Sequence, residues 1–276
     1  MPKTTLLSLR KRLNARLAEL YEAREAQRMA ALLVAHRLGL ARHQLILLAD
    51  TEPTDAQQQT LEADLERLLR HEPLQYVLGE ADFMGLRIQV GPGVLIPRPE
   101  TEELVQWVAQ TVAPDSSILD VGTGSGCIAL GLKQLLPQAY LEGWDASEQA
   151  LAYARQNADA LGLAVHWALQ DVFRARLDCW PVVVSNPPYI PPEEAATLHP
   201  HVRDWEPHQA LFAPQGDPLA FYTYILLHTP GAVFLECHSG TAEDLARWVA
   251  RQGMPYQLRN DLQGRPRMLY RPALGA

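Results

Sequence analysis

Residues 117–126 read SILDVGTGSG, where a short apolar run passes into alternating glycines, and the rest of the fold can be worked out from it. Ser117–Val121 has the composition of a buried strand. The glycines that follow permit a tight turn and a close approach of the backbone to a ligand, because they carry no Cβ atom. A helix is expected over Cys127–Leu136, so its free N–H groups face that ligand and favour a carboxylate.

Strands and helices alternate from this stretch to the C-terminus. Further strands are expected at Tyr140–Trp144, Ala164–Leu169, Val182–Ser185 and Ala232–Glu236, and a closing pair at Tyr256–Arg259 and Arg267–Arg271. Helices are expected at Ser147–Leu161, Phe221–His228 and Thr241–Gln252, whereas residues 187–216 are Pro-rich and expected to form a loop without regular structure, as a lid or substrate wall. This alternation predicts an α/β, Rossmann-like fold with a seven-stranded, mostly parallel sheet between helices.

The N-terminal part has a different pattern. Leucines at 6, 9, 13, 17 and 20 form one apolar stripe, and further helices are expected at Ala23–Leu38, Arg42–Leu48 and from Thr54 or Asp55 to Arg70. Phe83–Val90 and Val94–Ile96 flank the turn signal at 91–93, which predicts a β-hairpin. The predicted domains are therefore a helical bundle at 1–75, a hairpin linker at 76–98 and a sheet domain at 99–276.

Composition narrows the class of protein. The net charge of −8 disfavours a broad nucleic-acid-binding surface. Three isolated cysteines without paired spacing favour a reducing compartment, so a cytoplasmic location is expected and no metal site is predicted. No apolar run reaches the length of a membrane helix, and the N-terminus lacks the pattern of a secretory signal.

The glycine loop and two later carboxylates predict a nucleoside site. Asp145 ends a strand about twenty residues after the glycines, where an acidic side chain meets ribose hydroxyls in such folds. The alternative for Asp145 is a helix-capping role. Asp171, with Val172 beside it, is expected to take an adenine ring, or else to be an ordinary turn residue. The spacing G-x-G-x-G differs from the G-x-G-x-x-G of dinucleotide sites and favours S-adenosylmethionine over NAD. The cofactor-binding residues predicted from these motifs are Gly122, Thr123, Gly124, Ser125, Gly126, Asp145, Asp171 and Val172.

The segment Asn186-Pro187-Pro188-Tyr189 follows the apolar run Val182–Ser185. Proline cannot continue a central strand, so the chain leaves the sheet here. The Asn186 side-chain oxygen and the Pro187 carbonyl then offer two acceptors that suit a planar NH₂ group, and Tyr189 offers an aromatic face. All four residues are predicted to bind substrate, with Asn186, Pro187 and Tyr189 as the catalytic residues. A Pro-rich strand end with a turn Asn is the structural alternative.

These motifs carry a family resemblance. Asn-Pro-Pro-Tyr after the fourth strand, with the glycine loop after the first, is similar to class I amino- and amide-methyltransferases. The stretches 72–79 (EPLQYVLG) and 95–102 (LIPRPETE) resemble the bacterial methyltransferases that modify a glutamine of peptide chain release factors. Further points of resemblance are Phe83, Val202-Arg203, Glu206-Pro207, Asp261, Gly264 and Arg267.

The resemblance implies a substrate, a cofactor and a partner. The substrate would be the glutamine of a Gly-Gly-Gln motif in a class I release factor, and the helical domain would help to hold that factor. S-adenosylmethionine would be the methyl donor and S-adenosylhomocysteine the product, in a monomeric enzyme that supports translation termination. The resemblance also implies that Asn186 binds this cofactor as well as the glutamine. The competing predictions are methylation of a ribosomal-protein glutamine and methylation of a nucleic-acid amino group by base flipping, which the acidic charge disfavours.

Two sets of basic residues each have two interpretations from the sequence. Arg98 either belongs to the wall of the cofactor or glutamine pocket or is an ordinary surface cation. Lys3, Arg10, Lys11, Arg12 and Arg16 make the first helix basic, which is typical of a solvated face but would also suit an acidic patch on a protein partner.

Overall fold

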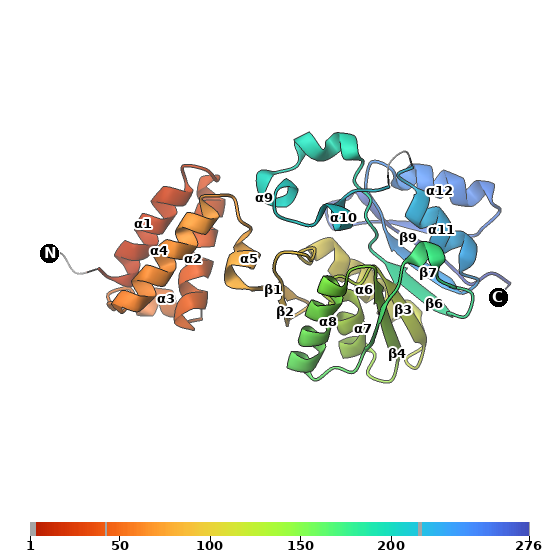
Figure 1. Cartoon of the computed structure of the whole chain (residues 1–276), viewed down its shortest axis with the longest axis horizontal. Coiled ribbons are helices and arrows are strands. Elements are labelled where there is room, and N and C mark those ends of the chain that lie inside the picture. The colour runs from red at the N-terminus through yellow and green to blue at the C-terminus, as the bar shows by residue number, and fades with distance from the viewer. Residues whose placement is uncertain (1–3, 42, 215–216, 276) are drawn as a thin grey trace. The chain divides into compact units, whose positions relative to one another are not determined.

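A computed structural model describes residues 4–41, 43–214 and 217–275 (Figure 1). Lys3 and Arg42, which belong to the predictions above, lie outside these ranges. The chain divides into two compact units. One comprises the described residues up to Gly79 together with Pro200–Trp205, and the other comprises Glu80–His199 together with the residues from Glu206 onward.

The first unit is helical, as the leucine spacing predicts. Its helices are α1 (Leu6–Leu17), α2 (Ala23–Leu38), α3 (Gln44–Leu47), α4 (Asp55–Leu68) and α5 (Leu74–Leu78), joined by α9 (Pro200–Arg203). Thr5 and Thr54 begin α1 and α4 with capping boxes, in which each threonine side chain accepts the N–H three residues later. The first four leucines of the stripe are buried, but Leu20 lies beyond the end of α1 and is 42% exposed, so its assignment to the stripe was wrong.

The basic residues of α1 make ion pairs along its exposed side. Arg12 pairs with Glu62, and Arg16 lies 3.7 Å from Glu66, both acidic residues belonging to α4. The four side chains are between 42% and 62% exposed, so each pair contributes little to stability.

The predicted hairpin exists, but its turn lies elsewhere in the sequence. Strands β1 (Glu80–Phe83) and β2 (Leu86–Gln89) pair antiparallel around Met84 and Gly85, whose φ angles are 51° and 78°. Positive φ at both central residues is the geometry of a type I′ turn, which normally contains Asn-Gly. Residues 91–93 form instead a separate turn, in which Val94 N–H bonds Gly91 C=O, on the way to α6 (Pro99–Thr111).

The predicted α/β fold is confirmed. In the part of the chain that the structure describes, seven strands form one sheet in the order β5-β4-β3-β6-β7-β9-β8. The strands are β3 (Ser117–Val121), β4 (Tyr140–Asp145), β5 (His166–Leu169), β6 (Val182–Ser185), β7 (Ala232–Glu236), β8 (Gln257–Asn260) and β9 (Pro266–Arg271). The first five are parallel, and β9 pairs antiparallel with both β7 and β8.

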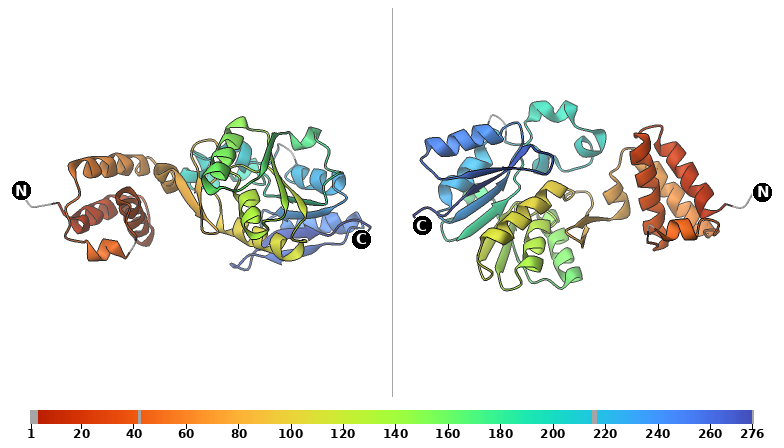
Figure 2. Two further views of the ribbon diagram at one scale, coloured as in Figure 1. Left: turned by 90° about the horizontal axis from the view of Figure 1, so that it is seen from below. Right: turned by 180° about the vertical axis from the view of Figure 1, so that it is seen from behind.

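Alternate residues of the central strands pack against helices on opposite faces. Leu119, Val183 and Leu235 share a core with α11 (Ala220–His228) and α12 (Ala242–Arg251). On the other face, Trp107 of α6 packs edge-on against Phe234 of β7. Figures 1 and 2 show α11 and α12 on one side of the sheet, and α6, α7 (Cys127–Leu135) and α8 (Glu148–Leu161) on the other. No helix within the described ranges combines the length and apolarity needed to cross a membrane.

The segment 187–216 is not structureless, contrary to the prediction. It contains the 3₁₀ helix η2 (Pro192–Thr197), α9 and α10 (His208–Leu211), and Ile190 forms an isolated bridge with Phe212. Residues 215 and 216 lie outside the described ranges. Prolines at the start of each short helix are compatible with a first turn, where the missing N–H has no partner to lose.

Candidate active site

The register of the parallel strands places the ends of four strands in one row. Val121 pairs with both Trp144 and Ser185, and Ser185 pairs with Leu235. The residue that follows each of these is a candidate site residue, in the order Asp145, Gly122, Asn186, Glu236 across the sheet. Ligands of open α/β sheets bind at this carboxyl edge, where the strand order reverses.

The glycine loop has the conformation that its composition predicts. Gly122, Gly124 and Gly126 have φ angles of 72°, 57° and 84°, in the left-handed region that favours glycine. Gly126 is the N-cap of α7, and a Cβ atom there would lie 2.9 Å from the Trp167 ring. Thr123 and Ser125 are buried within the loop. The loop therefore needs glycine both for its backbone angles and for its packing.

Asp145 connects the loop with the next helix. Its Oδ2 accepts the Gly124 N–H at 2.9 Å and its Oδ1 accepts the Ser147 N–H at 2.9 Å. Burial raises the pKa of the Asp145 carboxyl, and these backbone hydrogen bonds act in the opposite direction. The N-cap of α8 is Ser147, so Asp145 contacts the backbone of the capping residue and does not itself cap the helix. Its carboxylate has four acceptor positions, so these contacts leave it able to accept a further hydrogen bond.

Asp120 is a buried carboxylate that the sequence argument did not single out. Its Oδ2 accepts hydrogen bonds from Thr123 Oγ1 at 2.6 Å and from Ala129 N–H at 3.3 Å. Its Oδ1 is buried and has no hydrogen-bond partner among the described residues. Burial raises the pKa of Asp120 to about 7. The signal in the sequence was a carboxylate inside an apolar strand, two residues before the first glycine of the loop.

Asp171 and Val172 follow β5 and begin the 3₁₀ helix η1 (Val172–Arg174). The Asp171 Oδ1 accepts the Phe173 N–H at 3.0 Å, and Arg174 lies 3.4 Å from the same carboxylate. The Val172 side chain is buried in the core shared with α11 and α12. Asp171 therefore has the turn contact of its alternative role.

The Asn-Pro-Pro-Tyr segment is held by a buried carboxylate. Asn186 Nδ2 donates to Thr101 Oγ1 at 3.3 Å, Thr101 Oγ1 donates to Glu236 Oε2 at 2.6 Å, and Tyr189 OH donates to Glu236 Oε1 at 3.2 Å. Burial raises the pKa of Glu236, opposed by these hydrogen bonds and by the nearby Arg267. Pro187 and Pro188 lie between the two anchored residues, with Pro187 buried. The sequence argument missed the role of Thr101 and Glu236, although Glu236 ends an apolar strand as Asp145 does.

Arg98 is not a free surface cation. Its Nη2 lies 2.5 Å from Glu206 Oε1, and Glu206 Oε2 accepts the Ile96 N–H at 3.0 Å. The Glu206 side chain is fully buried, so this charge depends on Arg98 for compensation. The pair connects the segment before α6 with the segment before α10. Burial and the nearby Glu236 raise the pKa of the Tyr189 phenol, and Arg98 is close enough to oppose part of that rise.

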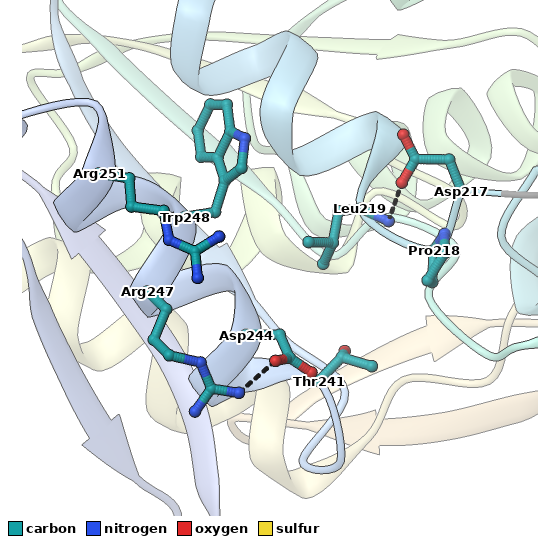
Figure 3. A pocket seen from close by; sticks show the side chains of 8 residues that line it. All are labelled: Asp217, Pro218, Leu219, Thr241, Asp244, Arg247, Trp248 and Arg251. Carbon is teal, nitrogen blue, oxygen red and sulfur yellow. Dashed lines mark hydrogen bonds and ion pairs between the residues drawn. The ribbon is translucent and has the colours of Figure 1, made fainter.

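A surface hollow of about 340 Å³ lies beside α12, apart from these residues (Figure 3). Among its charged groups, Arg247 pairs with Asp244, and the Asp217 carboxylate accepts the Leu219 N–H. None of the predicted site residues lines it. Within the described ranges, no three His, Cys, Asp or Glu side chains are grouped as metal ligands.

Comparison with known proteins agrees with this arrangement. Residues 8–79 match the family model of the PrmC N-terminal domain, and residues 99–200 match that of the methyltransferase small domain. Among solved structures, the hMettl16 catalytic domain in complex with MAT2A 3′UTR hairpin 6 has a TM-score of 0.53 at 20% identity, covering 79% of this chain and 82% of that one. This likeness shows the fold alone.

Closer relatives cover nearly the whole chain. A release factor glutamine methyltransferase of Bacteroides thetaiotaomicron is 37% identical over 263 residues, which is 92% of this chain and 95% of the relative. That of Cereibacter sphaeroides is 38% identical over 255 residues, or 89% and 90% of the two chains. Identity at this level over this length means that the chain belongs to the release factor glutamine methyltransferase family.

Proposed function

We propose that this protein transfers the methyl group of S-adenosylmethionine to the side-chain amide nitrogen of the glutamine in the Gly-Gly-Gln motif of class I release factors. The observation that carries the proposal is the row formed by Asp145, Gly122 and Asn186 at one edge of the sheet, in a chain of this family. The row puts residues suited to a nucleoside next to residues suited to an amide.

The residues at the loop suit the cofactor. S-adenosylmethionine, when bound, supplies a methyl group on a positively charged sulfur and leaves as S-adenosylhomocysteine. Gly122–Gly126 would face its carboxylate with backbone N–H groups, and Asp145 would accept ribose hydroxyls with its remaining lone pairs. The buried, unpartnered Oδ1 of Asp120 supports the presence of a donor group at this place. Asp171 and the Val172 backbone would contact the adenine.

The Asn-Pro-Pro-Tyr segment would hold the glutamine. Asn186 Oδ1 and the Pro187 carbonyl would each accept one hydrogen from the substrate NH₂, and Tyr189 would pack against the flat carboxamide. An amide nitrogen is a weak nucleophile because its lone pair is delocalised. Holding it in line with the methyl group contributes on the order of 7–11 kcal/mol. The two oxygens also stabilise the positive charge that develops on nitrogen, and the extra proton then passes to water.

The partner and setting follow from the substrate. The helical residues 1–75 would bind the release factor, with the hairpin 76–98 as a linker and the sheet domain 99–276 as the catalytic part. The reaction would take place in the cytoplasm, with the enzyme as a monomer.

The test is incubation with methyl-labelled S-adenosylmethionine and one of three acceptors: release factor, ribosomal proteins or nucleic acid. We expect one added methyl group on the Gly-Gly-Gln peptide, located by tandem mass spectrometry. A release factor with alanine in place of that glutamine serves as the matched control and should stay unlabelled. Label found only in ribosomal proteins or only in nucleic acid would replace this proposal with one of its competitors.

A further inference from the structure

Glu236 is a buried carboxylate that the proposed transfer does not use directly. It ends β7 and is 1% exposed. Its two oxygens accept from different elements of the fold, Oε2 from Thr101 in α6 and Oε1 from Tyr189 after β6. A buried carboxylate is costly unless hydrogen bonds and a nearby cation compensate its charge, and here Thr101, Tyr189 and Arg267 do so.

The direction of these hydrogen bonds fixes the asparagine side chain. The Thr101 hydroxyl has one hydrogen, which it donates to Glu236 Oε2 at 2.6 Å. Its oxygen can then only accept from Asn186, so the amide nitrogen of Asn186 must face Thr101, at 3.3 Å. The amide is planar, and Oδ1 therefore points away from Thr101. Within the described part of the chain, Oδ1 accepts no hydrogen bond.

This orientation matters for a substrate that donates. If the Asn186 amide turned by 180°, its NH₂ group would meet the NH₂ group of the glutamine, and neither could accept from the other. An isolated asparagine has no strong preference between the two orientations. The two consecutive hydrogen bonds, from Asn186 to Thr101 and from Thr101 to Glu236, select one of these orientations before the substrate binds.

We propose that Glu236, through Thr101 and Tyr189, is the positioning residue that sets the Asn186 oxygen and the Tyr189 ring for the glutamine amide. The inference rests on the proposed function, because it concerns how the same site holds its substrate. Glu236 would act through these two residues and not by touching substrate or cofactor itself. Its effect is to keep one of two side-chain orientations and to restrain both ends of the Asn-Pro-Pro-Tyr segment.

The test compares two substitutions at one position. Thr101→Val keeps the shape but removes the hydroxyl, and should lower kcat for release factor about 10-fold, which corresponds to one lost hydrogen bond. The Kd for S-adenosylmethionine should stay within about twofold of wild type. Thr101→Ser restores the hydroxyl and should recover most of the kcat.

A matched control comes from the opposite edge of the sheet. Thr229 precedes β7, is 1% exposed, and its hydroxyl has no partner among the described residues. Thr229→Val should leave kcat unchanged, since it removes a buried hydroxyl of no consequence for Asn186. Melting temperatures of all variants show that each is folded.

Glu236→Met, which has a similar volume and no acceptor, supplies the second arm. It should lower kcat as Thr101→Val does, and the double variant should lose little more than either one, because the two act through one chain. If it fails to fold, the Thr101 variants decide alone. Wild-type kcat in Thr101→Val, or Thr101→Ser as impaired as Thr101→Val, would overturn the inference. Absence of transfer by the wild-type protein would instead contradict the proposed function.

Discussion

The Asp145 carboxylate accepts the Gly124 N–H at 2.9 Å and so ties the end of β4 to the glycine loop after β3. The same carboxylate accepts the N–H of Ser147, which is the N-cap residue of α8. One side chain therefore shapes the loop and is also the residue proposed to bind the ribose. A substitution of Asp145 should therefore disturb the geometry of the loop and weaken cofactor binding at the same time.

Asp145→Asn should raise the Kd for S-adenosylmethionine about 10- to 100-fold, since hydrogen bonds to a charged group contribute about 1.5–3 kcal/mol. The amide must also turn an NH₂ toward one of the two N–H donors. Isothermal titration calorimetry measures the effect. Asp178→Asn removes an exposed carboxylate that, among the residues the structure describes, pairs only with Arg176, and this variant should bind the cofactor as wild type does. Unchanged affinity in Asp145→Asn would exclude its role at the ribose.

Asn186→Ala should lower kcat by about 10²–10³, the usual effect of losing one preorganised group that stabilises developing charge. Cofactor affinity should change far less, because the contact is made mainly with the substrate amide in the transition state. Steady-state kinetics with release factor, together with cofactor titration, separates the two quantities. A variant with near-normal kcat would refute the proposed amide clamp.

Arg98→Met should destabilise the protein by about 3–5 kcal/mol, because it leaves the buried Glu206 charge without its cation. Urea denaturation followed by circular dichroism measures the change. The double variant Arg98→Met, Glu206→Gln should recover much of the loss, because the amide oxygen still accepts the Ile96 N–H. Equal stability of the single and double variants would show that the buried charge is not what matters.

Asp120→Asn should change how stability depends on pH. The pKa of Asp120 is about 7 in the folded protein against an ordinary 3.8, so between these values the folded state keeps a proton that the unfolded state has released. Wild-type stability should therefore fall as pH rises through this window, with the full cost present above it.

The amide keeps both hydrogen bonds, from Thr123 and from Ala129, and cannot ionise. The variant should gain on the order of 2–4 kcal/mol over wild type at pH 8 and little at pH 4. Denaturation at several pH values checks the difference between the two proteins. A difference independent of pH would mean that Asp120 titrates normally.

Local sequence patterns were sufficient to predict the strands that position the candidate active site. Apolar runs predicted β3 and β6 with the bounds that the structure has, and β4 to within one residue at its end, since burial on both faces leaves a clear signal in the sequence. The hairpin turn was predicted at 91–93 because Gly-Pro-Gly is a strong turn signal, whereas Met84-Gly85 is not. The short helices in 187–216 were not predicted, because the prolines of this segment indicate irregular structure. A proline can also occupy the first turn of a helix, as Pro192 and Pro200 do.

Sequence patterns could not predict the contacts between segments that lie far apart along the chain. From the sequence, Glu206 was expected to belong to a loop. The structure shows that it pairs with Arg98, which lies 108 residues earlier in the chain. Glu236 read as the end of a strand, and its bond to Thr101 spans 135 residues. A hydrogen-bond partner is chosen by where the packed elements bring two groups, and spacing along the chain does not contain that information.

The amino-acid sequence by itself determined the kind of sheet, the glycine loop and the chemical groups at the strand ends, because each depends on local periodicity and backbone sterics. Tertiary structure alone decided which way the Asn186 amide faces, which carboxylates are buried and what compensates them. Those features depend on desolvation and on hydrogen-bond direction, and both are settled only when β6, β7 and α6 pack together.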